Sequence, residues 1–389
     1  MDPDLSQLDE ALDSAGVDGY LLDAASTDAD QRYLSGFDAP DPFYTLYDGD
    51  THLLVSSLEY GRARTESRAD TVARHAAYEP DDADAEGRAA SIPTLAAFLD
   101  AHDVNSVLVP PRCPVGTADG LREQGVAVTA EEARGTLTEI RATKTGEEIE
   151  HVRDAQAANE RAMARTEELI REATVEDGLL HHEGAVLTSE RVATAIEIAL
   201  LREGYALEET IVACGADAAD PHDRGSGPLR AGEPIIVDVF PRDKASNYHG
   251  DLTRTFTKGD PGERVREWYD LTHEAQRAAL DAIEPGTTGA AVHDAVCDVY
   301  EDAGEPTLRD DPEAETGFIH GTGHGVGLDV HELPSVSAGG RELEPGHVIT
   351  VEPGLYDPAV GGVRIEDLVV VTADGYESLT DYPKALVVE

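Results

Sequence analysis

The chain has 389 residues, 79 acidic against 30 basic side chains, a net charge of −49 and 40% hydrophobic residues. This apolar content predicts a folded protein of about two domains rather than a disordered one. The negative charge disfavours binding to nucleic-acid phosphates, and no apolar stretch reaches the ~18 residues that a membrane span needs. The acidic start, which lacks a basic and apolar leader, predicts a cytoplasmic protein.

The negative charge is spread evenly along the chain. Residues 1–150 hold 31 acids and 11 bases (11 − 31 = −20), and residues 151–389 hold 48 acids and 19 bases (19 − 48 = −29). Lysine is scarce, with four residues in all. Such a surface is typical of salt-loving organisms such as haloarchaea, because carboxylates keep a protein hydrated while salt screens their repulsion. A protein that binds basic partners would instead concentrate its acids in one segment.

Residues 1–140 alternate short apolar runs with a helical pattern. Strands are predicted at residues 17–22, 51–55 and 106–109, and a helix is predicted at residues 92–99. This order predicts an N-terminal α/β domain. We find no catalytic group of residues in it.

The pattern changes near residue 141, and Thr145 and Glu148 then form a predicted capping box. A long helix is expected from there towards residue 173. Apolar residues at helical spacing predict three more helices around residues 192–200, 268–279 and 292–300. Strands are predicted at residues 235–240, 249–257, 347–352 and 363–371. Helices and strands are interspersed, so residues 141–389 are predicted to form an α+β domain.

Four acidic residues interrupt apolar, strand-like surroundings in this second part. Asp238 lies inside an apolar strand, and Asp251 follows thirteen residues later, after a segment that resembles a hairpin loop. The two carboxylates could then face each other across adjacent strands. Glu352 follows another predicted strand, and Glu366 stands fourteen residues further, near the start of the last one. A charge in such a setting is costly unless it is paired or binds a metal.

The segment 320–332, His-Gly-Thr-Gly-His-Gly-Val-Gly-Leu-Asp-Val-His-Glu, contains three histidines, His320, His324 and His331, and four glycines. Glycines let the backbone approach a ligand closely. Imidazoles supply metal ligands and carry protons near neutral pH. This composition predicts that the segment contributes to a functional site.

Each of these acidic residues, taken alone, is more often a turn, capping or paired residue than a metal ligand. Together, two Asp, two Glu and one His form an oxygen-rich set whose four carboxylates match the charge of two divalent cations. Two such ions would bind a bridging hydroxide, polarise a carbonyl and stabilise the oxyanion that forms during hydrolysis. The ligand types indicate Mn²⁺, Co²⁺, Fe²⁺ or Zn²⁺.

In order and context, five residues resemble the ligands of the M24 metallopeptidases, the family of methionine aminopeptidases, prolidases and aminopeptidases P: Asp238, Asp251, His324, Glu352 and Glu366. The resemblance covers residues 145–389 and implies the pita-bread fold for residues 141–389. A first domain of about 140 residues resembles the creatinase/prolidase branch. The resemblance therefore implies hydrolysis of Xaa-Pro bonds, as a dipeptidase or an aminopeptidase, by a hydroxide that bridges two metal ions, Mn²⁺ most of all. The resemblance further implies a small peptide with proline in second position as the partner, and a homodimer.

The resemblance also implies roles for single residues. Asp238 is expected to bind one metal with both oxygens, Asp251 and Glu366 to bridge the two ions, and His324 and Glu352 to complete the other metal's shell, with Glu352 as proton shuttle. The catalytic set is expected to include His222 and His331 beside Glu352. Substrate contacts are expected from His320, Tyr356 and Arg364.

The chain departs from the family after the first aspartate. Many members have Asp-Phe-Gly or Asp-Tyr-Gly there, whereas this chain has Asp238 followed by Val239-Phe240-Pro241. This leaves the preferred substrate size open. An alternative function is that of two-domain relatives that act on small non-peptide substrates, such as compatible-solute hydrolases or a lyase of dimethylsulfoniopropionate. A third alternative, a silent binding protein, is disfavoured because all five ligand positions are kept.

Overall fold

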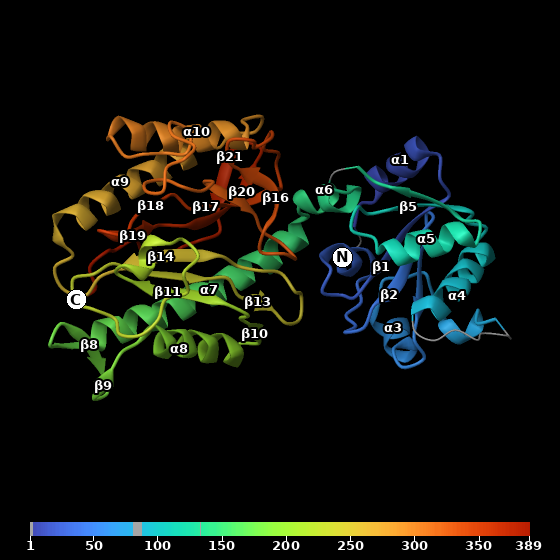
Figure 1. The fold of residues 1–389 in the computed structure, drawn as a ribbon, viewed down its shortest axis with the longest axis horizontal. Helices are drawn as coiled ribbons and strands as arrows, with labels where there is room; N and C mark the ends of the chain where they lie inside the picture. Colours follow the sequence, from blue (N-terminus) through green and yellow to red (C-terminus); the bar gives the residue numbers. More distant parts are fainter. Residues whose placement is uncertain (1–2, 81–87, 133) are drawn as a thin grey trace. The chain divides into compact units, whose positions relative to one another are not determined.

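The structure is a computed structural model of the chain, and it describes residues 3–80, 88–132 and 134–389 (Figure 1). The chain divides into two compact units, Met1–Arg141 and Ala142–Glu389. In the described residues, every helix is too short or too polar to span a lipid bilayer. Each unit is described by itself below.

The first unit is built on one six-stranded sheet with helices around it. Its strands follow the order β4 (Thr71–Arg74), β3 (Thr51–Val55), β2 (Phe43–Tyr47), β1 (Gly19–Ala24), β5 (Ser106–Val109) and β6 (Ala127–Ala130). The pairs β1–β2 and β2–β3 are antiparallel and the other three pairs are parallel. The helices are α1 (Ser6–Ala15), α2 (Ala29–Ser35), α3 (Tyr60–Glu66), α4 (Arg88–Ala101), α5 (Val115–Glu123) and α6 (Thr136–Ala142).

Both faces of the central strands in this sheet are buried. On β3, Leu54 packs into one apolar cluster, while its neighbours Leu53 and Val55 pack into another. Successive side chains of a strand point to opposite faces, so a run of apolar residues fits a sheet that is covered on both sides. The strands predicted at residues 51–55 and 106–109 have these bounds in the structure. The strand predicted at residues 17–22 begins two residues later, at Gly19.

The second unit opens with the long helix α7 (Gly146–Glu172). The predicted capping box is present: the Glu148 amide donates to Thr145 Oγ1 at 3.3 Å, and the Thr145 amide donates to Glu148 Oε2 at 2.8 Å. These two bonds satisfy amide groups that have no partner inside the helix, which fixes where α7 begins.

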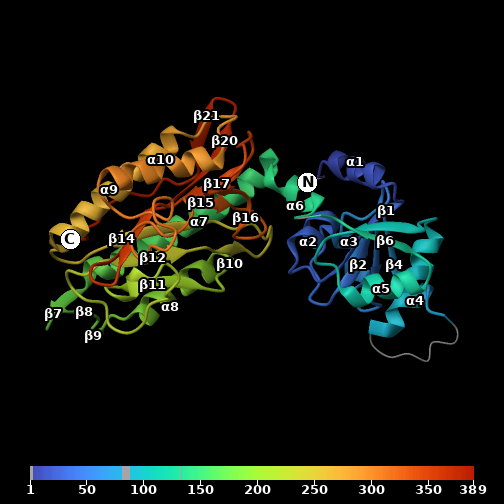
Figure 2. The same ribbon diagram turned by 45° about the horizontal axis from the view of Figure 1, so that its top comes forward.

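Most of this unit consists of two helix pairs that pack on a three-stranded and a five-stranded sheet, as can be followed in Figure 2. Helices α7 and α8 (Ser189–Arg202) pack on the sheet β11-β12-β14, which comprises β11 (Thr210–Cys214), β12 (Ile235–Val239) and β14 (Leu252–Phe256). Helices α9 (Gly262–Asp281) and α10 (Gly289–Asp302) pack on the other half, whose strand order is β16 (Glu332–Val336), β15 (Gly323–Gly325), β17 (Val348–Val351), β20 (Asp367–Thr372) and β21 (Gly375–Ser378).

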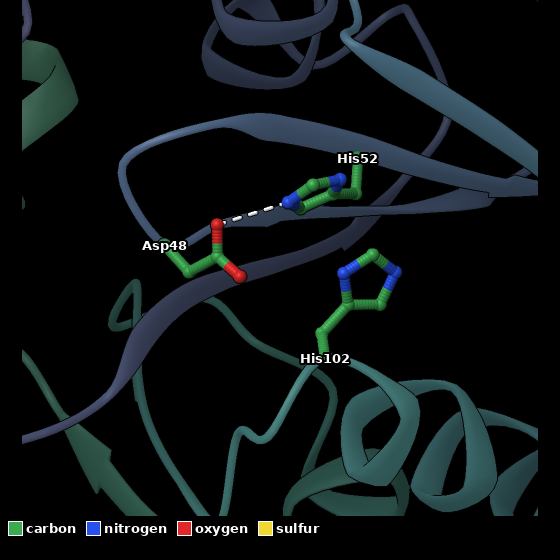
Figure 3. Close-up of side chains that lie close together, drawn as sticks. All are labelled: Asp48, His52 and His102. Carbon is green, nitrogen blue, oxygen red and sulfur yellow. Dashed lines mark hydrogen bonds and ion pairs between the residues drawn. The ribbon is translucent and has the colours of Figure 1, made fainter.

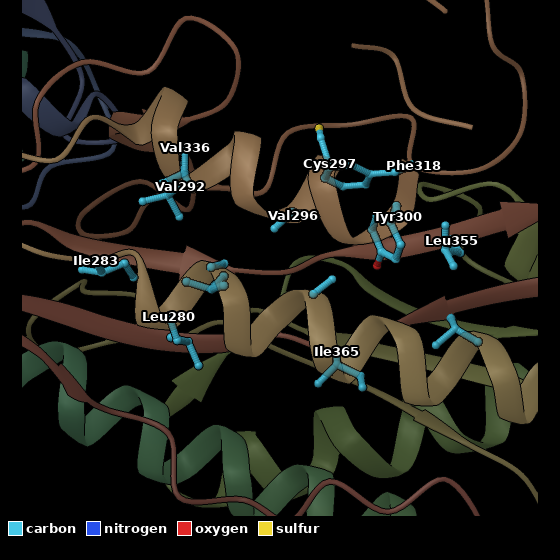
Figure 4. Packing of buried hydrophobic residues seen from close by; sticks show 14 of the residues in the cluster. Leu280, Ile283, Val292, Val296, Cys297, Tyr300, Phe318, Val336, Leu355 and Ile365 are labelled. Carbon is cyan, nitrogen blue, oxygen red and sulfur yellow. The ribbon is translucent and has the colours of Figure 1, made fainter. Parts of the chain in front are cut away.

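Shorter strands complete the unit: β7 (Thr174–Glu176), β8 (Leu179–His182), β9 (Ala185–Val186), β10 (Tyr205–Ala206), β13 (Arg242–Asp243), β18 (Gly354–Asp357) and β19 (Gly361–Arg364). Figure 4 shows the core beneath α9 and α10, where Val292 and Val296 of α10 lie with Leu280 of α9 in one buried cluster. The helical spacing of these apolar residues is what places them on one face.

One predicted strand is two in the structure. The segment predicted at residues 363–371 ends as β19 at Arg364 and resumes as β20 at Asp367. Between them the amide of Glu366 donates to the carbonyl of Thr253 in β14. The chain thus leaves its pairing with β18, touches β14 and then joins β17. This passage brings Glu366 to the strand that follows Asp251.

Candidate metal centre

The pairing of β12 with β14 places the two aspartates on neighbouring strands. Asp238 is in register with Thr253, and Asp251 lies two residues before Thr253, immediately ahead of β14. Residues two apart on a strand point to the same face. Asp238 and Asp251 are therefore diagonal neighbours rather than directly opposite, and both line one cavity.

Hydrogen bonds from neighbouring elements fix the positions of Asp251 and Glu366. Gln156 of α7 clamps the main chain of Asp251, because its Oε1 accepts the Asp251 amide and its Nε2 donates to the Asp251 carbonyl, both at 2.9 Å. The hydroxyl of Thr253 donates to Glu366 Oε2 at 2.9 Å. Both carboxylates are almost fully buried, at 4% and 2% exposure.

His324 comes from the short strand β15, where its ring faces the carboxylates. Its Nε2 lies 3.7 Å from Asp251 Oδ2 and 3.4 Å from Glu352 Oε1. Its Nδ1 lies 3.1 Å from the carbonyl of Gly325. A proton on Nδ1 would be donated to that carbonyl, which leaves the Nε2 lone pair free for a metal ion. One ligand atom from each of Asp251, His324 and Glu366 lies within 4.8 Å of the others.

Burial sets the protonation of these groups. It raises the pKa of Asp251 and of Glu366 well above the usual values, and the neighbouring carboxylates add to both shifts. It also raises the pKa of Glu352 to about 8. Burial lowers the pKa of His324 to about 3, with a smaller contribution from His331. His324 is therefore neutral at pH 7 and does not compensate the charge of the carboxylates.

Divalent cations fit this set of side chains. Asp238 Oδ2 pairs with Arg364 Nη2 at 2.7 Å, but Asp238 Oδ1 is buried without a hydrogen-bond partner among the described residues. Such an orphaned oxygen is costly unless it meets a cation or donor. Four carboxylates and a neutral imidazole share the space with one buried guanidinium, so the donor set suits hard to borderline metal ions.

The cavity has a volume of about 1000 Å³, and all five predicted metal ligands line it. His222, His320, His331 and Arg364, four of the other residues predicted for the site, also line it. The fold therefore brings together, in one cavity, predicted site residues that lie up to 144 positions apart, from His222 to Glu366.

Tyr356 differs from the other predicted substrate residues, because it is fully buried and is not among the side chains that line the cavity. Its hydroxyl lies 3.0 Å from His320 Nε2 and accepts a hydrogen bond from Arg364 Nη1 at 2.9 Å. The three side chains form a chain of polar contacts that leads from the cavity to Asp238. Burial lowers the pKa of His320 to about 3, and Arg364 adds to this shift, so the ring is neutral.

His331 packs against a proposed metal ligand, whereas His222 is exposed to solvent. The ring of His331 is perpendicular to that of His324, with centroids 4.2 Å apart. His222 is exposed, and its amide donates to Asp220 Oδ1 at 2.9 Å. Its side chain is therefore at the solvent side of the cavity lining.

Several residues around the site were missed by sequence reasoning. Gln156 carries no signal, since a glutamine on a helix is usually a surface residue. Thr253 could have been found, because it lies two residues after Asp251 on the same face of a strand. Glu208 and Glu209 line the cavity as well, but they resemble many other acids of this chain.

Comparison with known proteins gives the class of this protein. The family model described as metallopeptidase family M24 matches residues 150–373, and the one described as creatinase/prolidase N-terminal domain matches residues 5–143. The chain belongs to metallopeptidase family M24, with a creatinase-type N-terminal domain ahead of a pita-bread catalytic domain. The fold expected from the resemblance is thereby confirmed.

Individual relatives narrow the comparison. The chain is 28% identical to the Xaa-Pro dipeptidase of Pyrococcus furiosus over 98% of this chain and 99% of that protein. It is 37% identical to the probable dipeptidase PepE of Mycobacterium tuberculosis over 66% of this chain, and the match spans 63% of the length of that relative. Among solved structures, the prolidase of Pyrococcus horikoshii OT3 superimposes with a TM-score of 0.79 at 26% identity, covering 98% of this chain and 99% of that one.

Proposed function

We propose that this protein hydrolyses Xaa-Pro peptide bonds with two divalent metal ions, as a dipeptidase or an aminopeptidase. The observation that carries the proposal is the meeting of four carboxylates and one neutral imidazole in a single cavity, with one buried oxygen of Asp238 left without a partner among the described residues. The relatives from Pyrococcus furiosus and Pyrococcus horikoshii, which match over 99% of their length, are Xaa-Pro dipeptidases by name, and this supports the substrate class.

Each side chain has a proposed task at this centre. Asp251 and Glu366 would bridge the two ions, Asp238 would complete the shell of one, and His324 and Glu352 would complete that of the other. The bound ions would activate water and polarise the scissile carbonyl. Glu352, which accepts a long hydrogen bond from Thr350 Oγ1 at 3.4 Å, would carry the proton from the nucleophile to the leaving amine.

Three histidines are assigned to the substrate, and Arg364 is assigned to the orientation of a metal ligand. We assign His320, held by the Tyr356 hydroxyl, to the proline side of the substrate. His331, packed against His324, is assigned to the carbonyl at the scissile bond. Arg364 would keep Asp238 oriented through their 2.7 Å ion pair. His222 would contact the substrate at the cavity's entrance.

Product analysis with Ala-Pro and Ala-Pro-Ala tests the proposal. We expect Ala to be released from one or both peptides after addition of Mn²⁺, with Co²⁺ and Zn²⁺ as comparison ions. Chelation of the metals and the variant Asp251→Asn are expected to abolish the reaction. The variant His182→Gln, which changes a histidine outside the cavity, is the matched control. Full activity after stringent chelation would disprove the proposal.

Two non-peptide compounds, ectoine and dimethylsulfoniopropionate, complete the substrate panel. Turnover of either one without turnover of the peptides would favour the alternative function on the same fold. Cleavage of Ala-Pro alone would assign the dipeptidase mode, and cleavage of Ala-Pro-Ala the aminopeptidase mode.

Other features of the protein are part of the same proposal. We propose Mn²⁺ as the native ion, a homodimer in solution, and a domain boundary between residues 140 and 141. Elemental analysis of the purified protein and light scattering test the first two, and limited proteolysis tests the third. A cytoplasmic location stays a prediction.

A further inference from the structure

A second group of metal-binding side chain types lies in the first unit, far along the chain from the candidate metal centre. Figure 3 shows Asp48, His52 and His102 gathered at one end of the sheet. Asp48 is in the turn between β2 and β3, His52 is on β3, and His102 directly follows α4. One ligand atom from each residue lies within 4.8 Å of the other two.

His52 is held on both sides of its ring. Its Nε2 lies 2.9 Å from Asp48 Oδ1, and its Nδ1 lies 2.7 Å from the hydroxyl of Thr71 on β4. A hydroxyl group can donate or accept a hydrogen bond. The Asp48 carboxylate can only accept, so this contact places a proton on Nε2 when no ion is bound. A metal ion would replace that proton, and Nδ1–H would then donate to Thr71, which is the tautomer that a metal ion requires.

His102 is oriented by packing against two rings. Its centroid lies 4.1 Å from that of His52 and 4.8 Å from that of Phe98, one turn earlier in α4. Burial lowers the pKa of His102, and the nearby His52 adds to the shift. The ring is therefore held in the neutral form that binds metals. Its place at the end of α4 also favours a cation, because the last carbonyls of a helix carry partial negative charge.

We propose that Asp48, His52 and His102 bind one divalent transition-metal ion in the first unit. Two imidazoles and one carboxylate suit Zn²⁺, Co²⁺, Ni²⁺ or Cu²⁺ better than Mg²⁺ or Ca²⁺. The carboxylate oxygen of Asp48 that does not contact His52 points towards the His102 ring (Figure 3), and one ligand atom from each of the three residues lies within 4.8 Å of the others. Asp48 is 19% exposed, so water can complete the coordination shell.

The expected role of this ion is structural. It would connect the β2–β3 turn to the end of α4, two segments that lie about 50 residues apart in the chain. Because an ion that binds the folded state alone shifts the unfolding equilibrium, the first unit would unfold at higher temperature when the ion is present.

The experiment separates this site from the candidate metal centre. In full-length protein, the substitutions Asp251→Asn and Glu366→Gln weaken the centre, and Zn²⁺ and Co²⁺ are then titrated by calorimetry and visible absorption. We expect one ion per chain to remain bound. Adding His102→Phe, which keeps an aromatic ring beside Phe98 but removes the nitrogen ligand, is expected to weaken that binding at least about tenfold.

The matched control is His75→Phe, since His75 also packs against an aromatic ring in this unit, that of Tyr44, but lies outside the group. It should leave the titration unchanged. If the background variant fails to fold, wild-type protein and the single variant His102→Phe are equilibrated with Zn²⁺ and compared by elemental analysis. We then expect His102→Phe to hold one ion fewer per chain than the wild type. Equal metal content in wild-type and His102→Phe protein would overturn the proposal, as would the absence of a bound ion in the background variant.

Discussion

At the scale of single residues, Thr253 connects two groups of the candidate centre. Its hydroxyl donates to Glu366 and accepts a hydrogen bond from Arg364 Nε at 3.3 Å. The variant Thr253→Val keeps the shape of the side chain but removes both bonds, so Glu366 loses a group that orients it. We expect about a tenfold loss of metal affinity, as measured by calorimetric titration.

Thr257, just beyond the same strand, provides the control. Its hydroxyl is buried without a hydrogen-bond partner among the described residues, so Thr257→Val should not weaken metal binding. Equal losses in the two variants would mean that the effect of Thr253 comes from general disturbance of β14 rather than from Glu366.

Sequence alone identified charged residues that lie in apolar segments. Asp238 could be singled out because a charge inside an apolar strand needs a partner. Gln156 could not be, because its role depends on α7 lying beside the start of β14, a contact between positions 95 residues apart. The register that makes Asp238 and Asp251 diagonal neighbours was also beyond the sequence, since a hairpin of unknown loop shape fixes no register.

At the scale of elements, β15 depends on a glycine beside the proposed ligand His324. A Cβ on Gly323 would lie 2.1 Å from the carbonyl oxygen of Thr350 in β17, a distance at which the backbone must move. Gly323→Ala should therefore separate β15 from β17 and displace His324. We expect a destabilisation of about 1–3 kcal/mol and weaker metal binding, measured by thermal unfolding and by titration.

Gly339, in the turn after β16, is the comparison for this variant. A Cβ there meets no atom within 4 Å, so Gly339→Ala should change stability by less than about 0.5 kcal/mol. If Gly323→Ala behaved in the same way, close packing of β15 against β17 would not be what positions His324.

The cap of α2 gives a prediction that depends on pH. Asp28 accepts the amide of Gln31 at 3.0 Å and pairs with Arg112. Burial acts to raise the pKa of Asp28, but the bonds from Arg112 and Gln31 outweigh it and hold this pKa below its ordinary value of 3.8. Its charge therefore contributes stability above pH 3.8 that is lost as the pH falls further.

Two substitutions of Asp28 separate the effect of its hydrogen bond to Gln31 from the effect of its charge. Asp28→Ala removes both and should cost about 1 kcal/mol at pH 6, whereas Asp28→Asn keeps an acceptor for Gln31 and should cost less. Urea unfolding at pH 6 and pH 3 measures both effects. The difference between wild type and Asp28→Asn should shrink at pH 3, and a constant difference would show that the charge on Asp28 is not responsible.

Element prediction succeeded where one pattern covers a whole element and failed where the chain changes partners. Thr145 and Glu148 fix the start of α7 by local bonds, so the sequence was sufficient there. The segment at residues 363–371 was predicted as one strand, because apolar residues with strand preference stand on both sides of Glu366 and Asp367. Its division at Ile365 and Glu366 arises from the hydrogen bond of Glu366 to Thr253, a contact made in the folded chain.

At the scale of the whole molecule, three of the four lysines show how basic residues are used. Lys144 is buried and pairs with Glu332 at 3.0 Å, and Lys384 pairs with the buried Asp367. Lys258 donates to the carbonyl of Arg171 at 2.7 Å. These lysines hold parts of the fold together and do little to offset a net charge of −49.

This charge predicts a requirement for salt. Repulsion among surface carboxylates opposes the compact state, and the distance over which it acts falls from about 10 Å at 0.1 M salt to about 3 Å at 1 M. Raising KCl from 0.1 to 2 M should therefore raise the unfolding temperature by more than about 5 °C, measured by calorimetry with the metal concentration held constant.

NaCl at equal ionic strength is the control and should have the same effect as KCl, because screening depends on charge rather than on the identity of the ion. An unfolding temperature that stayed constant across this range would refute adaptation to salt. It would leave the proposed metal centre standing, since that proposal rests on the side chains that line one cavity and not on the net charge of the chain.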